Sequence, residues 1–411
     1  MMSELLTAAN PSSLDLFAPV VGAPEVEELR ALAAPLEGAT VEMVNSTAVG
    51  GGVAELLTRL VPLMRGVGLE ARWQVMQAAP EFFKVTKAFH NALHGSTRQT
   101  DLNGFGIFRE YNRRNLEQLS LDARFVVIHD PQPVALVEGR AADRPGRWIW
   151  RCHIDLSWPD AGVWSFLEPY VARFDGAIFS SPAFARQLPI PQYLFYPSID
   201  PLAEKNRELE PAFVARVLER FGIDGGRPII TQISRFDRLK DPVGVVRAYR
   251  LVKSYFDCQL VLAGGGAVDD PESSQVLAEV NEAGAGDPDI HILELPPSAP
   301  LEVNALQRAS TIVLQKSLRE GFGLTVAEAL WKKKPVVASA VGGIPIQVIH
   351  KHTGLLAHSI EGTAYQVRFL LSHPEIAKRL GEQGHEHVRE NFLITGNLKR
   401  YLTLFLHLSG R

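Results

Sequence analysis

The sequence predicts an α/β protein built from two parallel, doubly wound sheets. Its 411 residues are more than one ordinary hydrophobic core holds, so two or three domains are expected. Short apolar, β-branched runs alternate with helical patterns along both halves, which is typical of β-α-β units. The same plan restarts after a proline-marked switch at 196–201. We therefore expect two similar α/β domains.

The N-terminal half opens with a strand, a glycine turn and a helix. We expect the strand over 41–45, the turn at Gly50-Gly51-Gly52, and the helix over 53–65. Four further apolar runs of strand length follow, over 71–76, 125–129, 148–151 and 176–179.

The C-terminal half repeats this pattern and ends in a helical tail. A helix is expected over 241–255, and the tail is expected to be helical over about 386–408. We place the domains at 1–203 and 204–385, with the tail, 386–411, packing back on the first domain. Two Rossmann-like domains would face a central cleft between the carboxyl ends of both sheets. Ligands bind at such ends in open α/β folds. The strands expected in this half are 228–233, 259–263, 290–293, 310–315 and 335–338.

Composition and charge exclude several classes of function. The net charge is −4 and no Lys/Arg run exceeds 332–334, so a nucleic-acid surface is not expected. No run of 18 apolar residues or signal-peptide pattern is present, so we expect no membrane association and a cytoplasmic location. The two cysteines, Cys152 and Cys258, lie far apart and fit buried thiols in a reducing compartment.

The most informative segment is 319–330, with the sequence Arg-Glu-Gly-Phe-Gly-Leu-Thr-Val-Ala-Glu-Ala-Leu. Two glutamates stand eight residues apart, and a glycine-broken loop between them leads into a helical pattern. The expected strand over 310–315 precedes this loop. A strand, a glycine turn and a helix N-terminus together present free N–H groups to an anion. Two flanking carboxylates would suit a ligand with both phosphate and sugar hydroxyls.

Two cations follow the first expected strand of the C-terminal half. Arg235 and Lys240 lie between that strand and the next helix, where both are expected to converge on one anion. A guanidinium and an ammonium suit a diphosphate whose charge grows as a glycosidic bond breaks.

These two motifs resemble those of the retaining glycosyltransferases of family 4, which have the GT-B fold. The resemblance implies that Glu320 binds hydroxyls of the donor sugar and that Glu328 binds the nucleotide ribose. The backbone between the two glutamates would contact the donor. The resemblance implies that Gly321, Phe322 and Gly323 contact the donor sugar, and that Leu324 and Thr325 contact the diphosphate.

The same resemblance assigns roles to four residues outside that segment. Arg235 and Lys240 would stabilise the leaving diphosphate, and Gly51 would let a backbone N–H reach the donor phosphate. His153, just beyond the strand expected at 148–151, would bond the 6-hydroxyl of the donor sugar. The candidate catalytic residues are therefore His153, Arg235, Lys240 and Glu320.

The N-terminal half carries a narrower resemblance. His129-Asp130-Pro131-Gln132-Pro133 and the segments 81–91 and 148–157 are together similar to the trehalose glycosyltransferring synthases, and also to the fungal-type trehalose phosphorylases. Such synthases join a nucleotide diphosphate glucose to free glucose with retention, giving α,α-trehalose. Asp130, Gln132 and Trp158 are candidate acceptor-binding groups, although the same residues suit ordinary turns and cores.

The resemblance leaves other functions open. A trehalose phosphorylase, a transferase with another acceptor and a sugar-nucleotide epimerase remain alternatives, and Lys84 and Lys87 leave room for a sugar-phosphate acceptor. The partners expected are nucleotide diphosphate glucose (UDP-glucose, ADP-glucose or a guanine analogue), glucose and trehalose, with a homodimer as the candidate assembly. We expect no prosthetic group, no metal site and at most a stimulatory divalent cation.

Two further motifs receive structural interpretations. Asp287-Pro288-Asp289 imitates an Asp-x-Asp metal motif but is expected to form a surface turn. Gly342-Gly343-Ile344-Pro345, after the last expected strand, is expected to shape the wall of the cleft. No phosphate-binding loop of the Gly-x4-Gly-Lys-Ser/Thr type is present, which disfavours a kinase.

Overall fold

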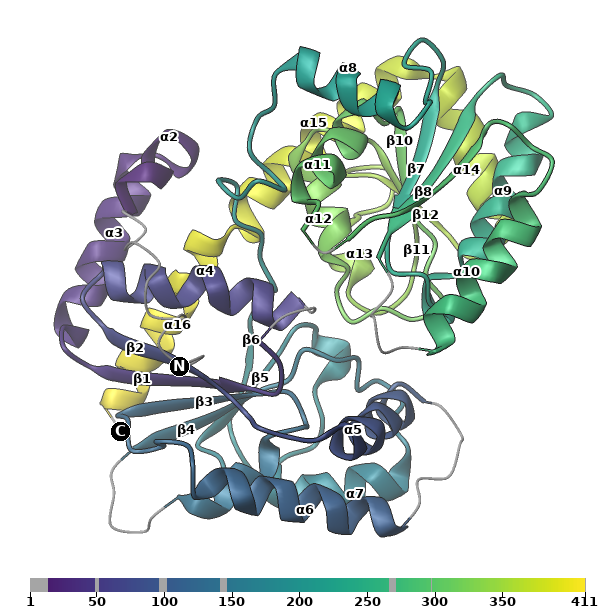
Figure 1. Ribbon diagram of the computed structural model, residues 1–411. Helices are drawn as coiled ribbons and strands as arrows, with labels where there is room; N and C mark the ends of the chain where they lie inside the picture. The colour runs from purple at the N-terminus through teal and green to yellow at the C-terminus, as the bar shows by residue number, and fades with distance from the viewer. Residues whose placement is uncertain are drawn as a thin grey trace. The chain divides into compact units, whose positions relative to one another are not determined.

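The chain forms two compact α/β units. The computed structural model describes residues 14–48, 52–95, 102–140, 146–265, 271–296 and 298–410. Unit 1 comprises Met1–Ser198 and Ile394–Arg411, and unit 2 comprises Ile199–Leu393 (Figure 1). The division thus lies at Ser198 rather than at the expected residue 203, and the chain returns to unit 1 at Ile394 rather than at 386.

Unit 1 is built on a six-stranded parallel sheet. Its spatial order, β2-β1-β3-β4-β5-β6, places the first strand inside the sheet, as doubly wound folds do. Every neighbouring pair in this sheet is parallel. The strands are β1 (Thr40–Asn45), β2 (Glu70–Val75), β3 (Phe125–His129), β4 (Arg147–Arg151), β5 (Gly176–Phe179) and β6 (Gln192–Leu194).

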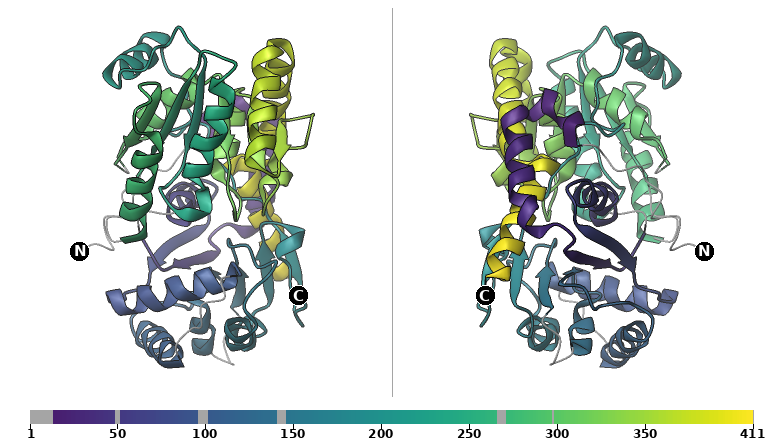
Figure 2. Two further views of the ribbon diagram at one scale, coloured as in Figure 1. Left: turned by 90° about the vertical axis from the view of Figure 1, so that its right-hand side faces the viewer. Right: turned by 90° about the vertical axis from the view of Figure 1, so that its left-hand side faces the viewer.

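Helices cover both faces of this sheet, because both faces are apolar. Successive residues of a strand point to opposite faces, so Met43 and Val44 enter different cores. Helices α3 and α16 lie alongside each other on the Met43 face (Figure 2). That face also carries α2 and α4, and the other carries α5, α6 and α7. The bounds are α2 (Ala18–Val21), α3 (Ala23–Ala33), α4 (Gly52–Gly66), α5 (Pro80–Leu93), α6 (Leu102–Leu116), α7 (Ala161–Val171) and α16 (Ile394–Ser409).

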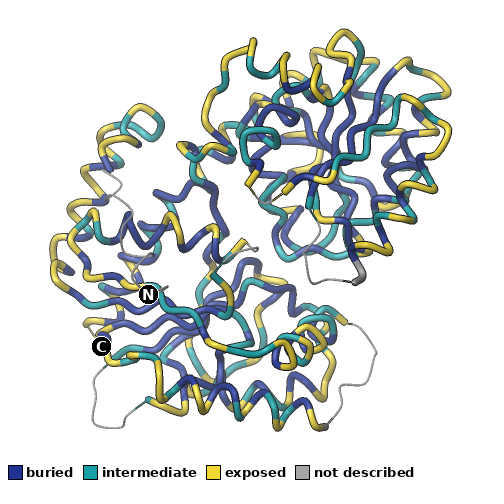
Figure 3. Tube along the Cα trace, viewed as in Figure 1, coloured by how far each residue is buried: buried dark blue, intermediate teal, exposed yellow. Residues whose placement is uncertain are grey.

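Unit 2 repeats the architecture with the order β12-β11-β10-β7-β8-β9. All of its neighbouring strands are parallel, and the strands are largely buried (Figure 3). The strands are β7 (Ile229–Ile233), β8 (Gln259–Gly264), β9 (Ile290–Glu294), β10 (Ile312–Gln315), β11 (Val336–Ser339) and β12 (Leu355–Ala357). The helices are α8 (Pro211–Arg220), α9 (Pro242–Lys253), α10 (Pro271–Gly284), α11 (Pro300–Ala309), α12 (Leu324–Trp331), α13 (Ile344–Gln347), α14 (Ile360–Ser372) and α15 (Pro374–Asn391).

The expected strands are all present, and each end lies within two residues of its prediction. The tail differs from the expectation of one helix over 386–408. Helix α15 of unit 2 continues to Asn391, Phe392 and Leu393 interrupt it, and α16 of unit 1 begins at Ile394. Phe392 and Leu393 are buried in unit 2, so the chain turns there to keep both apolar side chains out of water. Within the described ranges, no helix combines the length and apolar character that a bilayer span requires.

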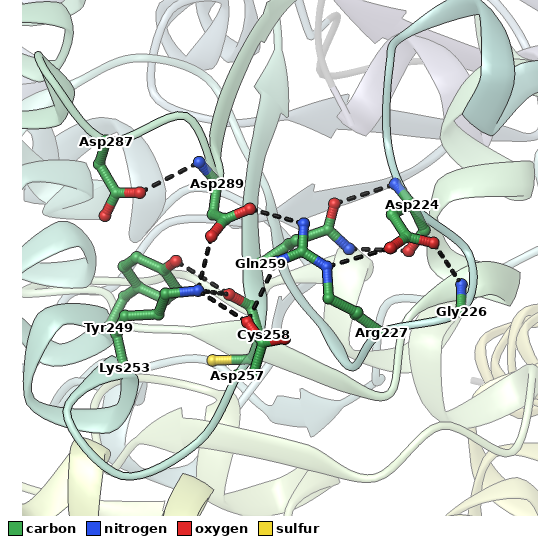
Figure 4. A network of polar contacts seen from close by, with 10 residues as sticks. All are labelled: Asp224, Gly226, Arg227, Tyr249, Lys253, Asp257, Cys258, Gln259, Asp287 and Asp289. Atoms are coloured by element: carbon green, nitrogen blue, oxygen red, sulfur yellow. Dashed lines mark hydrogen bonds and ion pairs between the residues drawn. The ribbon is translucent and has the colours of Figure 1, made fainter.

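The Asp287-Pro288-Asp289 turn has a structural role in unit 2. Asp289 accepts bonds from Arg227 Nη2 and Lys253 Nζ, each at 2.6 Å (Figure 4). Arg227 precedes β7 and Asp289 precedes β9, so this network ties together the amino ends of the strands. Those ends lie opposite the carboxyl ends, where ligands bind in such sheets. The two cations lower the pKa of Asp289 from its usual 3.8 to about 2.

We expect Asp289→Asn to destabilise unit 2 by on the order of 2 kcal/mol at pH 7, since Arg227 and Lys253 would lose their shared carboxylate. Because the folded pKa is depressed, this contribution is complete above pH 3.8 and is lost as the pH falls toward about 2. Denaturant unfolding at pH 7 and pH 3 measures the difference between variant and parent.

Asp257→Asn is the matched control, because Asp257 contacts the same two cations but its side chain is 71% exposed. It should cost clearly less than Asp289→Asn. A stability difference for Asp289→Asn that is unchanged at pH 3 would contradict the assignment.

Candidate active site

The loop after β10 carries the first candidate residues. Residues 316–323 connect the end of β10 at Gln315 to the start of α12 at Leu324. Gly323 precedes the helix with φ +82°, a left-handed conformation that glycine adopts without penalty. The first N–H groups of α12 have no intrahelical acceptor, and the helix dipole favours an anion there. This is the expected arrangement of strand, glycine turn and helix start.

Glu320 is held by three donors at one of its oxygens. Its Oε2 accepts from Lys240 Nζ at 2.5 Å, from Gln315 Nε2 at 3.2 Å and from Ser317 Oγ at 3.3 Å. The Lys240 and Glu320 side chains are only 16% and 9% exposed. The structure therefore unites two residues that the sequence analysis placed on separate motifs.

The two cations of the 235–240 segment engage different carboxylates. Lys240 pairs with Glu320, whereas Arg235 pairs with Asp237 at 3.0 Å and has a side chain that is 54% exposed. Asp237 also accepts from the backbone N–H of Lys240 at 3.1 Å, which fixes the turn. The two cations thus have different protein carboxylates as partners, and their convergence on a ligand diphosphate stays a prediction.

Amide side chains that the sequence analysis missed connect the two loops. Gln232 donates to the carbonyl of Lys240 at 2.9 Å and accepts from the N–H of Lys316 at 2.8 Å. Gln315 accepts from the Thr325 hydroxyl at 2.8 Å, so the Thr325 side chain is already engaged. Both glutamines are the next-to-last or last residues of buried strands, and a polar residue ending an apolar run was the available signal.

Glycines behind the loop explain the Gly342-Gly343 motif. A Cβ on Gly342 would lie 1.6 Å from the carbonyl oxygen of Glu320, and one on Gly343 would lie 2.5 Å from that of Gly321. The backbones therefore touch, and Gly343 N–H donates to Gly321 O at 3.1 Å. Only residues without a side chain allow this approach. The motif thus sets the position of the Glu320 loop.

Phe322 contributes through its backbone rather than its ring. The side chain is 5% exposed and packs edge-on against Phe392 at 5.5 Å between ring centroids. Its carbonyl accepts from Gln347 Nε2 at 2.5 Å. The expected sugar contacts of Gly321, Phe322 and Gly323 are therefore restricted to backbone groups.

Glu328 lies in the second turn of α12 and is 1% exposed. Its Oε1 is 3.4 Å from Lys205 Nζ, while its Oε2 finds no hydrogen-bond partner among the described residues. A buried acceptor without a donor is costly and fits a site that a hydroxyl completes. Lys332 donates to the Glu328 carbonyl at 3.1 Å, and burial lowers the pKa of Lys332 to about 7.

Unit 1 supplies the histidine site. The His153 backbone N–H donates to Asp130 Oδ1 at 2.7 Å, and the ring Nε2 lies 2.9 Å from Nδ1 of His129. The two rings stack at 5.2 Å between centroids. Burial, the charge of Arg151 and the neighbouring His129 ring hold the pKa of His153 well below its usual value, so the ring is neutral at pH 7.

The three candidate acceptor residues occupy different environments. Asp130 adopts φ +66° and uses one oxygen for His153, and burial raises its pKa to about 6. Gln132 Oε1 is buried and has no partner within the described part of the chain. Trp158 is 75% exposed and lies in the loop before α7. Gly51, the predicted phosphate-contacting glycine, falls outside the described residues.

Comparisons with known proteins agree with this architecture. Residues 43–186 match the family model "Trehalose synthase, N-terminal domain", and residues 216–387 match "Glycosyl transferases group 1". The trehalose synthase of Pyrococcus horikoshii is 44% identical over 97% of each chain. A trehalose phosphorylase of Pleurotus pulmonarius is 28% identical and covers 88% of this chain but 56% of its own length. The α,α-trehalose-phosphate synthase of Burkholderia xenovorans superposes with a TM-score of 0.73 at 16% identity, covering 90% of this chain and all of the other.

The fold and the site therefore define a glycosyltransferase with the GT-B architecture. Within that class, the chain belongs to the trehalose synthase family.

We expect Gly342→Ala to displace the Glu320 loop, because the new methyl group cannot occupy space 1.6 Å from a carbonyl oxygen. Stability should fall by about 2 kcal/mol or more, and the nucleotide diphosphate binding expected from the sequence should be lost. Denaturant unfolding and calorimetric titration with UDP and ADP measure the two effects.

Gly222→Ala provides the matched control in the same unit. Gly222 also has positive φ, +67°, but a Cβ there meets nothing within 4 Å. It should cost about 1 kcal/mol from backbone strain alone and leave nucleotide binding intact. Equal effects of the two substitutions would show that contact with the Glu320 loop is unimportant.

Proposed function

We propose that the protein transfers glucose from a nucleotide diphosphate glucose to free glucose, forming α,α-trehalose with retention of the donor anomer. The observation that carries the proposal is the grouping of Lys240, Glu320 and the N-terminus of α12 at the carboxyl ends of β7 and β10. A cation and a helix start suit a diphosphate, and a carboxylate suits sugar hydroxyls. The name trehalose synthase, carried by a relative that is 44% identical, supports the product.

Each group of unit 2 would act on a different part of the donor. The N–H groups of Leu324 and Thr325 would bind the diphosphate, Glu320 would accept from hexose hydroxyls, and the buried Glu328 would accept from the ribose. Glu328 Oε2 supports the last role, because a hydroxyl would satisfy an acceptor that lacks a partner among the described residues. His153 of unit 1 would bind a further hydroxyl of the transferred hexose.

In the proposed reaction, the bond between C1 of the donor glucose and the diphosphate oxygen breaks through an oxocarbenium-like state. The anomeric hydroxyl oxygen of the acceptor glucose bonds to C1 on the same face, and its proton passes to the leaving diphosphate. Lys240 and Arg235 would stabilise the negative charge that develops on that diphosphate. Retention follows because both bonds lie on one face of the ring.

A trehalose phosphorylase is the second candidate, because a phosphorylase relative is 28% identical over 88% of this chain. In that reaction, inorganic phosphate would take the place of the nucleotide diphosphate. Phosphate alone leaves no role for a buried ribose acceptor, so Glu328 favours the nucleotide donor. A sugar-nucleotide epimerase would act on the donor without any acceptor.

Incubation with glucose and each of UDP-, ADP- and GDP-glucose, followed by mass and anomer analysis, tests the reaction. We expect α,α-trehalose and the matching nucleoside diphosphate from at least one donor. Parallel incubations should contain trehalose with phosphate, maltose alone, and each nucleotide sugar alone. Glucose 1-phosphate from trehalose and phosphate would indicate a phosphorylase, trehalose from maltose alone would indicate an isomerisation, and an epimerised sugar nucleotide would indicate an epimerase. Any of these results, without trehalose formed from a nucleotide sugar and glucose, would contradict the proposal.

We expect Lys240→Ala and Arg235→Ala each to lower kcat by about 100-fold or more, equivalent to about 3 kcal/mol of transition-state stabilisation. Donor affinity should change much less, because the cations act mainly on charge that develops during bond breaking. Steady-state kinetics with isothermal titration of the donor separates the two quantities.

Arg238→Ala is the matched control, because Arg238 lies in the same short 3-10 helix as Lys240 but pairs with the partly exposed Glu279. Its kcat should stay within a few-fold of the parent. Near-normal turnover of Lys240→Ala or Arg235→Ala would rule out the role assigned to that residue.

A further inference from the structure

A chain of three side chains runs from Met43 on β1 through His129 on β3 to His153 in the loop after β4. Met43 lies on β1 and pairs in register with Val127 of β3, and His129 lies two residues further along β3 on the same face. His129 Nε2 is 3.4 Å from Met43 Sδ, and its Nδ1 is 2.9 Å from His153 Nε2. His129 is fully buried, and each of its two ring nitrogens contacts one of these side chains.

The methionine end of this chain fixes where one proton lies. A thioether sulfur carries lone pairs and has no hydrogen to donate. His129 Nε2 must therefore carry the hydrogen that points at Met43. The opposite tautomer would place a bare ring nitrogen against a bare sulfur, two acceptors without a proton between them.

The remaining protons follow because both rings are neutral. Burial, followed by the charge of Arg151, lowers the pKa of His129 to about 3, and the pKa of His153 is held well below its usual value. A neutral His129 with hydrogen on Nε2 has a bare Nδ1, which must accept from His153. His153 therefore carries its only ring hydrogen on Nε2, and its Nδ1 is bare.

Charged neighbours hold this arrangement in place. Arg151, the register partner of His129, is buried and donates to Ser180 Oγ at 3.1 Å and to the Phe195 carbonyl at 2.8 Å. Its positive charge opposes protonation of both imidazoles. Asp130 accepts from the His153 backbone N–H, so His153 is held both through its main chain and through its ring Nε2.

We infer that Met43 and His129 are positioning residues that fix the tautomer of His153, so that His153 Nδ1 can only accept a hydrogen bond from a hydroxyl of the transferred hexose. The assignment of a hexose hydroxyl as the hydrogen-bond donor rests on the proposed function. The positions of the ring hydrogens rest on the contacts among Met43, His129 and His153 alone. A substituent that only accepts hydrogen bonds, such as a fluorine or an ether oxygen, would face a bare nitrogen and be rejected. His153 therefore contributes to the selection of an unmodified hexose.

Nuclear magnetic resonance of the full chain labelled with ¹⁵N-histidine tests the proton order without any substrate. Long-range ¹H–¹⁵N correlations distinguish Nε2–H from Nδ1–H tautomers, and the spectra of His129→Asn and His153→Asn assign the two rings. We expect Nε2–H for both residues, with a scalar coupling between His129 Nδ1 and His153 Nε2. An Nδ1–H tautomer or an imidazolium at His153 would overturn the inference.

Met43→Leu removes the sulfur acceptor at nearly constant volume. The Nδ1–H form of His129, and with it an Nδ1–H form of His153, should then appear in the spectrum. Met64→Leu is the matched control, since Met64 is equally buried in the same core. Unchanged tautomers in Met43→Leu, or identical changes in both variants, would remove Met43 from the chain.

The functional test compares two replacements of His129. Asn places an amide oxygen where Nδ1 stood and can still accept from His153, whereas Leu offers no acceptor. We expect His129→Leu to lower kcat/KM for the donor about ten-fold and His129→Asn to retain most of it. Equal losses in the two variants would assign His129 a packing role only. The spectra of the parent protein need no turnover, so a failure of the proposed reaction would be seen separately in the product analysis.

Discussion

The largely buried ion pair between Lys240 and Glu320 is the interaction on which the candidate donor site depends. Taking two opposite charges out of water is favourable only when their geometry is good and their remaining hydrogen-bonding capacity is used. Gln315 and Ser317 supply further donors to the carboxylate, and Gln232 fixes the main chain at Lys240. The ion pair therefore joins the loops after β7 and β10, and the close backbone contacts of Gly342 and Gly343 set the position of the Glu320 loop.

Patterns that are local in sequence predicted the fold well. Apolar runs of strand length located β1, β3, β7 and β10 to within two residues, because a strand buried on both faces is apolar throughout. The break between α15 and α16 was missed, since the helical pattern continues through Phe392 and Leu393. Those residues belong to a core formed by distant segments, which no local pattern reports. The three-residue strands β6 and β12 were missed because they are too short to show a period.

The sequence predicted most residues of the candidate site but not the contacts between them. Glu320, Lys240 and Glu328 were singled out, but the pairing of Lys240 with Glu320 and of Arg235 with Asp237 required the structure. Gln232, Gln315 and Met43 carry no motif of their own, and the contacts of His129 cannot be read from the segment that contains it. Gln232 joins Lys240 to Lys316, which is 84 residues from Gln232, and Met43 contacts a histidine 86 residues away. Spacing in the sequence gives no information over such distances.

The crowding of three donors onto Glu320 Oε2 has a consequence for what the site can recognise. A carboxylate anchored through one oxygen cannot rotate, so the direction of its other oxygen is settled before any ligand arrives. That oxygen has only lone pairs to offer, as have Glu328 Oε2 and the bare nitrogen inferred for His153. In the proposed complex, each of these acceptors would need a hydrogen that the ligand supplies. Each hydroxyl of a polyol can donate such a hydrogen. Methylation or deoxygenation of a hydroxyl that the protein contacts would leave the acceptor without a hydrogen-bond donor.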